Sequence, residues 1–342
     1  MKRKKTGKQV EKRMEHPFRW AFIGAGTLGK QVAREITASG RHQIVSVYTR
    51  NPEKRAAFAR EYGAFAAETA LQAMDRADVD GVYIVTPHTS HAQYTLQALS
   101  LGKPVLCEKP VTTDAEQAEE MIRLSREKGV YFAEAMWTWF SPIANKVKEW
   151  LDHGEYGDIL QARMTYRMMS LHYAPRVSDP NVGGGALLDV GIYPLTYFYR
   201  LFGYPEKIVC RGTLKNGIDT KETVHLHYPG GKIFTASISI VDCWGLEKMK
   251  LLGTKGETVL PFYHYANQVT LRKKEGGTEK FQSDGGMLNE FDRVAEEIRQ
   301  GRKESAYVPH EATLNVMKMM DECRRQMGLV YPFEREAGRA AE

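Results

Sequence analysis

A glycine-rich turn near the start of the chain constrains the fold more than any other feature. Residues 24–29 read Gly-Ala-Gly-Thr-Leu-Gly; they follow an apolar run at 18–23 and precede a segment with helical spacing at 30–39. In this strand–turn–helix context the first glycine makes the tight turn, the second lets the backbone approach a pyrophosphate, and the third lets helix and strand pack closely. The free N–H groups at the helix N-terminus favour the anion. The residues that we expect to bind a dinucleotide here are Gly24, Gly26, Thr27, Leu28 and Gly29.

The residues at the end of the second strand predict which dinucleotide binds. An NAD-specific site places Asp or Glu about 20 residues after the glycines, where it bonds the ribose 2′-hydroxyl. This chain has Thr49 and Arg50 there. A carboxylate would repel a 2′-phosphate, whereas Thr49 can hydrogen-bond it and Arg50 can pair with it. We therefore expect NADP in preference to NAD, although Thr49 permits either cofactor and Arg50 also fits a solvated turn.

Strand and helix patterns alternate through the first part of the chain. After the glycine turn, apolar runs at 43–48, 81–85, 104–107 and 130–133 are separated by segments with helical spacing. Such alternation is typical of βαβ units with a parallel sheet covered on both faces. We expect a Rossmann dinucleotide-binding domain at 17–139.

The pattern changes after about residue 140, where a helix is expected at 142–153. Strand-like segments then follow without intervening helices, and two helices, at 288–300 and 310–327, close the chain. The expected strands lie at 159–168, 207–214, 223–227, 232–240, 249–252, 258–261 and 268–273. This arrangement predicts an α+β second domain at 140–335 with an antiparallel sheet.

Charge and composition exclude several classes of protein. The net charge of +6 belongs to residues 1–13, which we interpret, with 14–16, as a disordered basic leader; the remaining residues carry 41 basic and 41 acidic side chains. A neutral body disfavours a nucleic-acid partner. No apolar run reaches the 18–20 residues or so of a membrane span. The four cysteines show no CxxC spacing, so we expect reduced thiols, a cytoplasmic protein and no metal site.

Two further motifs give the chain a family resemblance. Residues 102–110 read GKPVLCEKP, and residues 183–194 read GGGALLDVGIYP. With the glycine turn they resemble, in type and order, the Gfo/Idh/MocA family, named for glucose–fructose oxidoreductase and inositol dehydrogenase. The resemblance implies a Rossmann domain followed by a domain with an open, mostly antiparallel sheet that often forms a dimer interface. It therefore implies a homo-oligomer, either a dimer or a tetramer.

The third motif narrows the resemblance to one branch of that family. Its Asp-x-Gly-x-Tyr form, ending at Tyr193, looks like the dimeric dihydrodiol dehydrogenases and the glucose–fructose oxidoreductase and xylose dehydrogenase branch. Residues 134–138 (EAMWT) are also similar to the dihydrodiol dehydrogenases, and Arg176 matches a recurrent arginine. The branch usually has Arg where this chain has Trp139, which argues against copying a substrate across.

The resemblance implies that Lys109 and Tyr193 handle the proton of an alcohol. Lys109 follows a strand's carboxyl end, where ligands bind in open α/β sheets; its alternative is a surface lysine. A nearby ammonium group favours the phenolate of a tyrosine, so a Lys109–Tyr193 pair makes chemical sense. Tyr193 also fits a core aromatic residue. Asp189 lies four residues earlier on the same helix face, where it orients Lys109, binds a substrate hydroxyl or is a helix-terminal charge.

Further site residues follow from their position in the family. The residues expected to line the cofactor, with caps, surface positions or a buried salt bridge as their alternatives, are Thr86, Pro87, His88, His91, Glu108 and Lys109. The residues expected to line the substrate pocket, with a solvated strand edge as the alternative, are Arg176, Tyr166, Arg167 and His172.

The sequence therefore predicts an NADP-dependent oxidoreductase. It would transfer a hydride between nicotinamide and a secondary or hemiacetal CH–OH of a sugar, a polyol or a cyclic trans-diol. Two alternatives remain open: a closed-cycle sugar- or glycoside-processing enzyme with tightly bound NAD(P), and a non-catalytic sensor of dinucleotide or sugar. The acid/base set disfavours the sensor, because a sensor needs no such residues.

Overall fold

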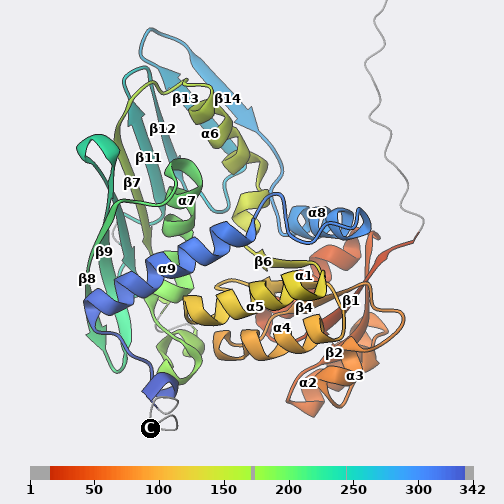
Figure 1. Ribbon diagram of the computed structural model, residues 1–342. Helices are drawn as coiled ribbons and strands as arrows, with labels where there is room; N and C mark the ends of the chain where they lie inside the picture. The colour runs from red at the N-terminus through yellow and green to blue at the C-terminus, as the bar shows by residue number, and fades with distance from the viewer. Residues whose placement is uncertain (1–15, 171–173, 244, 336–342) are drawn as a thin grey trace, which may run out of the picture.

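Two β-sheets organise the protein, and each belongs to a different part of the chain (Figure 1). The computed structural model describes residues 16–170, 174–243 and 245–335. Almost all of the expected basic leader therefore lies outside the described residues. In the described part of the chain, no helix has the length and apolar character needed to cross a membrane.

The first sheet is six-stranded and parallel, in the order β3-β2-β1-β4-β5-β6. Its strands are β1 (Phe18–Ile23), β2 (His42–Tyr48), β3 (Phe65–Ala66), β4 (Gly81–Ile84), β5 (Val105–Glu108) and β6 (Phe132–Ala135). The helices around them are α1 (Thr27–Ala38), α2 (Pro52–Tyr62), α3 (Ala70–Met74), α4 (His91–Ser100) and α5 (Ala115–Lys128). The Rossmann prediction is confirmed. Strand β3 and helix α3 were not predicted, because two and five residues are too few to show a periodicity.

The second sheet is eight-stranded, in the order β14-β13-β12-β11-β7-β10-β9-β8. Its strands are β7 (Ile159–Arg167), β8 (Lys207–Lys215), β9 (Ile218–Tyr228), β10 (Lys232–Ser239), β11 (Lys248–Gly253), β12 (Gly256–Pro261), β13 (Gln268–Lys273) and β14 (Thr278–Gln282). Within the described residues, β7 and β10 form its one parallel pair. The mostly antiparallel sheet is confirmed, although β14 was missed and β9 begins five residues earlier than expected.

Helices cover one face of the second sheet. They are α6 (Pro142–Asp152), α7 (Ile192–Phe202) and α9 (His310–Met327), which contact β13 and β14, β7, and β8 respectively (Figure 1). A π-helical turn, Leu187–Gly191, runs directly into α7. This turn contacts β9 and β10, and the preceding Gly183 lies against His88 of the first domain.

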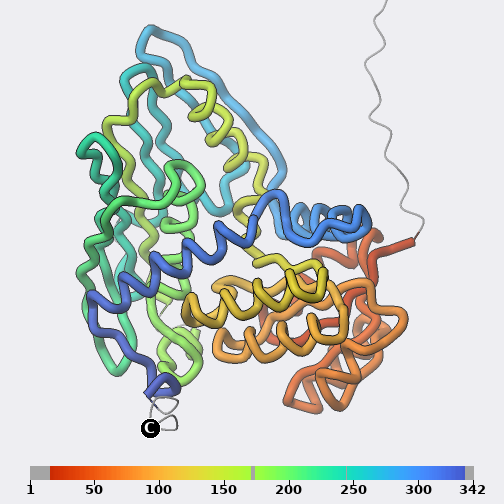
Figure 2. Tube along the Cα trace, in the orientation of Figure 1, coloured from red at the N-terminus to blue at the C-terminus, as the bar shows by residue number. Residues whose placement is uncertain are grey.

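The last two helices bring the chain back to the first domain, as the blue end of the tube shows (Figure 2). Helix α8 (Leu288–Arg299) inserts Phe291 between Trp20 and Tyr83, with ring centroids 5.1 and 5.0 Å away. Helix α9 packs along α5, where Asp321 accepts a hydrogen bond from the N–H of Ala115 at 2.8 Å. Helices α8 and α9 thus connect the second domain to the first.

Candidate active site

The glycine turn has the free space and the free donors that a pyrophosphate needs. Gly24 has φ +117°, and a Cβ there would lie 2.4 Å from the carbonyl oxygen of Val85, so only glycine fits. A Cβ on Gly26 would meet nothing within 4 Å, and no side chain caps the N-terminus of α1. The orphan N–H groups at Thr27 and Leu28 therefore face an open cradle. These residues fit a bound dinucleotide.

The end of β2 is open and basic. Thr49 is half-buried and Arg50 is exposed. Arg55, on α2, donates to the carbonyl oxygen of Thr49 at 3.4 Å and adds a second guanidinium that no sequence motif marks. The place where an NAD site carries a carboxylate thus holds a hydroxyl and two arginines.

Lys109 directly follows β5, and its side chain reaches the second domain. Its Nζ donates a hydrogen bond to the backbone carbonyl of Asp189 at 2.8 Å and lies 4.6 Å from the centroid of the Tyr193 ring. Burial lowers the pKa of Lys109, while the charge of Asp189 opposes that shift. The structure therefore brings together the three residues for which the resemblance implied proton transfer.

The hydroxyl of Tyr193 has a different partner from the one expected. It accepts a hydrogen bond from the indole N–H of Trp137 at 3.2 Å, whereas Lys109 lies over the ring. Burial raises the pKa of Tyr193, and the carboxylates of Glu108 and Asp189 add to that shift. Burial therefore keeps Tyr193 in its phenol form, and the charge of Lys109 acts through the ring face instead of through a bond to the hydroxyl.

Asp189 forms an ion pair with Arg176, with 2.7 Å between Oδ1 and Nη2. Burial raises the pKa of Asp189, but the charges of Lys109 and Arg176 outweigh it and hold the pKa below its usual value. The carboxylate is 9% exposed and the arginine 55%, so the pair leads from the buried site to the surface.

The two histidines after β4 hold backbone carbonyls. His88 Nδ1 lies 3.3 Å from the carbonyl oxygen of Gly183, and burial lowers the pKa of His88 to about 3. His91 has both ring nitrogens on carbonyl oxygens, Nδ1 at 3.0 Å from Pro110 and Nε2 at 2.8 Å from Thr86. Burial lowers the pKa of His91, and a neutral ring donates to only one of these carbonyls, so His91 fixes either the segment after β4 or the segment after β5.

Glu108 is buried beneath these segments. Its Oε1 accepts from the hydroxyl of Tyr83 at 2.5 Å, and its Oε2 accepts from the N–H of Lys109 at 3.2 Å. Glu134, on β6, accepts from Thr313 and from the N–H of Val111, and burial raises its pKa to about 7. Two buried carboxylates thus accept hydrogen bonds from the backbone N–H groups at Lys109 and Val111.

Tyr166 belongs to an aromatic cluster with Tyr193 and His264. Its ring stacks on that of Tyr193, with centroids 5.4 Å apart, and its hydroxyl lies 3.1 Å from Nε2 of His264. His264 and its partner Glu247 were missed, since they lie in a strand-rich region with no motif. Trp137 stood within a motif but was given no role. His172 lies outside the described residues.

Two other predicted residues lie apart from this cluster. Arg167 pairs with Asp242, with 3.2 Å between Nε and Oδ1. Trp139, at the position where the branch usually has Arg, is buried with the guanidinium carbon of Arg200 5.1 Å from its ring centroid. Arg200 also donates to the carbonyl oxygen of Trp139 at 3.1 Å. Helix α7 thus brings an arginine to this position from elsewhere in the sequence.

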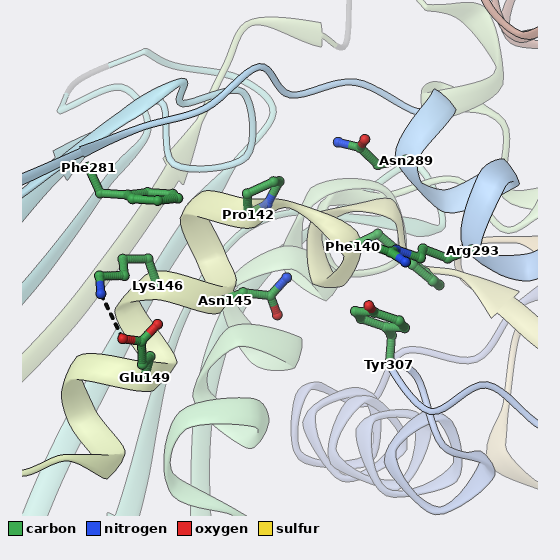
Figure 3. Close-up of a pocket in the computed structure, with 9 residues that line it drawn as sticks. All are labelled: Phe140, Pro142, Asn145, Lys146, Glu149, Phe281, Asn289, Arg293 and Tyr307. Carbon is green, nitrogen blue, oxygen red and sulfur yellow. Dashed lines mark hydrogen bonds and ion pairs between the residues drawn. The ribbon is translucent and has the colours of Figure 1, made fainter. Parts of the chain in front are cut away.

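A separate cleft of about 320 Å³ lies between α6, β14 and α8 (Figure 3). Its lining residues, drawn in that figure, are Phe140, Pro142, Asn145, Lys146, Glu149, Phe281, Asn289, Arg293 and Tyr307. None of them belongs to the group around Lys109. Among the described residues, no cluster of three His, Cys, Asp or Glu side chains is arranged to hold a metal ion.

The fold and this site define a two-domain, dinucleotide-dependent oxidoreductase. Residues 18–136 match the model of the oxidoreductase family with an NAD-binding Rossmann fold, and residues 144–259 match the Gfo/Idh/MocA C-terminal domain. The chain belongs to the Gfo/Idh/MocA family, as its motifs predicted.

Relatives of known activity match along nearly their whole length. A trans-1,2-dihydrobenzene-1,2-diol dehydrogenase of Mus musculus is 31% identical over 335 residues, which cover 93% of this chain and 99% of the relative. The scyllo-inositol 2-dehydrogenase (NADP(+)) of Bacillus subtilis is 29% identical, with the same coverage. The D-xylose 1-dehydrogenase (NADP(+)) of Hypocrea jecorina is 27% identical, covering 93% of this chain and 94% of the relative.

Solved structures confirm the fold. A 3-ketoreductase from Actinomadura kijaniata, in complex with NADP and TDP-benzene, has a TM-score of 0.81 at 22% identity, covering 91% of this chain and 98% of that one. A levoglucosan dehydrogenase in complex with NADH and levoglucosan has a TM-score of 0.79 at 18% identity, covering 92% and 98%. The predicted class, an NAD(P)-dependent oxidoreductase acting on CH–OH groups, is confirmed by these findings together.

Proposed function

We propose that the protein uses NADP to interconvert a secondary or hemiacetal CH–OH of a sugar, polyol or cyclic trans-diol and the corresponding carbonyl. The observation that carries this proposal is the convergence of Lys109, Asp189 and Tyr193 between the two domains. The three relatives named above act on a diol, an inositol and a sugar. All three of those substrates carry more than one hydroxyl group.

Each residue around Tyr193 and Lys109 has its own part in the proton transfer. A bound nicotinamide would supply or accept the hydride. Because burial raises its pKa, Tyr193 holds its proton at neutral pH and donates it to the substrate oxygen during reduction. The tyrosinate that forms is stabilised by the N–H of Trp137 and by the charge of Lys109 above the ring. Asp189, whose backbone carbonyl holds Lys109, keeps that ammonium in place, and Arg176 keeps Asp189 ionised.

The proposed cofactor contacts extend from the glycine turn to the ends of β4 and β5. Gly26, Thr27 and Leu28 would hold the pyrophosphate, and Thr49 and Arg50 the 2′-phosphate. The open, basic end of β2 and the NADP(+) in the names of two relatives support NADP in preference to NAD. Contacts with the rest of the dinucleotide are proposed for Thr86, Pro87, His88, Glu108 and Lys109.

We also propose a domain boundary, an assembly and a compartment. The boundary near residue 140 lies between β6 and α6, with α8 returning to the first domain. A second copy would cover the sheet face opposite the helices, where the apolar side chains of Ile233 on β10 and Val259 on β12 are exposed. The four cysteines are free thiols, which supports the cytoplasm.

The experiment is a steady-state assay of the purified protein with NADP(H) or NAD(H) and a panel of sugars, polyols and trans-diols. Turnover with NADP that exceeds turnover with NAD supports the proposal. Cofactor that co-purifies and never leaves would favour the closed-cycle enzyme. Tight binding of added cofactor without turnover of any substrate would contradict the proposal and favour the sensor.

A further inference from the structure

Three buried side chains, those of Tyr166, His264 and Glu247, contact one another in a row beside Tyr193. They have no part in the proton transfer described above. The hydroxyl of Tyr166 lies 3.1 Å from Nε2 of His264, and Nδ1 of His264 contacts a carboxylate oxygen of Glu247. The other carboxylate oxygen accepts the backbone N–H of His264 at 2.7 Å. The side chains of His264 and Glu247 are only 10% and 5% exposed. Glu247 therefore holds both the backbone and the ring of His264.

The donors and acceptors of this row of side chains give the hydroxyl of Tyr166 a direction. A carboxylate only accepts hydrogen bonds, so Nδ1 of His264 carries the proton. When the ring is neutral, Nε2 is then an acceptor, and the hydroxyl of Tyr166 donates to it. The oxygen of Tyr166 keeps lone pairs that can accept a hydrogen bond from another donor.

That oxygen lies in the same corner as the hydroxyl of Tyr193. The rings of Tyr166 and Tyr193 are nearly parallel, with 12° between their planes. The hydroxyl of Tyr193 reaches Trp137 and that of Tyr166 reaches His264, while the rings of Trp137 and His264 are 5.6 Å apart. Both phenol oxygens therefore lie beside the contact between the rings of Trp137 and His264. Tyr265, which is 63% exposed and packs on Trp137 and His264, continues this corner to the surface.

We propose that Tyr166 is a specificity-determining residue whose oxygen accepts a hydrogen bond from a second substrate hydroxyl, on the carbon next to the one that reacts. Glu247 and His264 are positioning residues that keep Tyr166 an acceptor. This inference rests on the proposed function, since it assumes that the reacting oxygen lies at Tyr193. A vicinal diol presents one hydroxyl to each of the two tyrosines, whereas a simple alcohol leaves the oxygen of Tyr166 without a donor.

The test compares trans-cyclohexane-1,2-diol with cyclohexanol, using NADP as the cofactor. Tyr166→Phe should lower kcat/KM for the diol by about 10- to 100-fold, mainly through KM, because one hydrogen bond in a desolvated site is lost. For cyclohexanol, kcat/KM should stay within about twofold, because that alcohol has no second hydroxyl to lose the bond. An equal loss on both alcohols, or no loss on either, would overturn the inference.

Two substitutions at His264 separate positioning from packing. In His264→Gln the amide oxygen can still accept from Tyr166, so the preference for the diol should be largely kept. His264→Leu fills a similar volume without an acceptor and should lose the preference. Nitrogen-15 shifts of the His264 ring should show a protonated Nδ1 and a bare Nε2 in the wild type, and a lone pair on Nδ1 would count against the inference. Equal behaviour of the two variants would also overturn it.

A binding measurement distinguishes failure of this inference from failure of the proposed function. Titration calorimetry of the NADP-saturated protein with each of the two alcohols requires no turnover. If the wild type is inactive on the whole panel but binds the diol more tightly than cyclohexanol, and Tyr166→Phe removes that difference, the proposed function fails, whereas the hydrogen bond from a diol hydroxyl to Tyr166 stands. If neither alcohol binds, or both bind equally, the role of Tyr166 is rejected.

Discussion

The ammonium group of Lys109 lies over the face of the Tyr193 ring, 4.6 Å from its centroid, and its hydrogen bond goes to the backbone carbonyl of Asp189. The lysine therefore acts on the tyrosine by its charge and not by a direct bond to the hydroxyl. The hydroxyl remains available to a substrate oxygen, with Trp137 as its one neighbouring donor among the described residues. This arrangement stabilises a tyrosinate when it forms without removing the proton beforehand.

Tyr193→Phe should lower kcat by about 10²- to 10⁴-fold, the usual contribution of a general acid or base. The dissociation constant for NADPH, measured by nucleotide fluorescence, should change little, because Tyr193 is placed against the substrate. In the wild type, kcat for oxidation should rise from pH 7 to pH 10, because burial raises the pKa of Tyr193 and the base form increases with pH. A variant with near-normal kcat would remove Tyr193 from the mechanism.

Gly24→Ala and Gly26→Ala should fail in different ways. At Gly24 a Cβ would lie 2.4 Å from the carbonyl oxygen of Val85 at φ +117°, so we expect a loss of about 2 kcal/mol or more in the free energy of unfolding. At Gly26 there is open space, so that variant should fold normally and bind NADPH more weakly. Thermal denaturation and fluorescence titration of both variants check this. Equal stability of the two variants would contradict it.

Thr49→Asp should shift the preference from NADP towards NAD, because the new carboxylate repels a 2′-phosphate and can accept from a 2′-hydroxyl. Arg50→Ala should lower affinity for NADP and leave affinity for NAD almost unchanged. We expect the ratio of kcat/KM with NADP to kcat/KM with NAD to fall by at least about tenfold in each variant. Arg60, exposed near the end of the same helix α2, offers a matched control, since Arg60→Ala should leave the ratio unchanged.

Arg176→Met should move the acid limb of the profile of kcat/KM against pH to higher pH. Arg176 holds the pKa of Asp189 below its usual value, so its removal lets that pKa rise. Arg176→Lys retains a positive charge and should give a smaller shift. Because only the folded-state pKa of Asp189 rises, the free energy of unfolding at pH 7 should fall by about 1.4 kcal/mol for each pH unit by which the limb moves. An unshifted acid limb in Arg176→Met would show that the ionisation of Asp189 does not govern the rate.

Glu134 should make the protein less stable as pH rises from about 4.5 to about 7. Its pKa is raised by burial to about 7, so in this interval the folded state binds more protons than the unfolded state does. In Glu134→Gln the amide oxygen can still accept from the N–H of Val111, and this pH dependence should disappear. Urea unfolding at pH 5 and pH 8 should show a fall in the wild type that exceeds the variant's by about 1–3 kcal/mol. Parallel behaviour of the two proteins would contradict the raised pKa.

The elements that could be predicted are those with a strong local pattern. The range of β13 agrees with the expected strand, and that of α9 with the expected helix, because apolar spacing and a closing Gly328 mark the helix. Strands β3 and β14 were missed, whereas the four-residue strands β4, β5 and β6 were found because they are buried apolar runs. Strand β14 alternates half-buried and exposed residues in a polar stretch, so its pairing with β13 leaves little trace in the sequence.

The amino-acid sequence by itself determined the Rossmann turn, the family, and the residue types needed for proton transfer, because those features depend on neighbours along the chain. Only the tertiary structure decided that Lys109 lies on the ring of Tyr193, that Asp189 pairs with Arg176, and that His264 and Glu247 meet Tyr166. These contacts join residues up to 98 positions apart. Their geometry, and the burial that sets each pKa, comes from packing the two domains together.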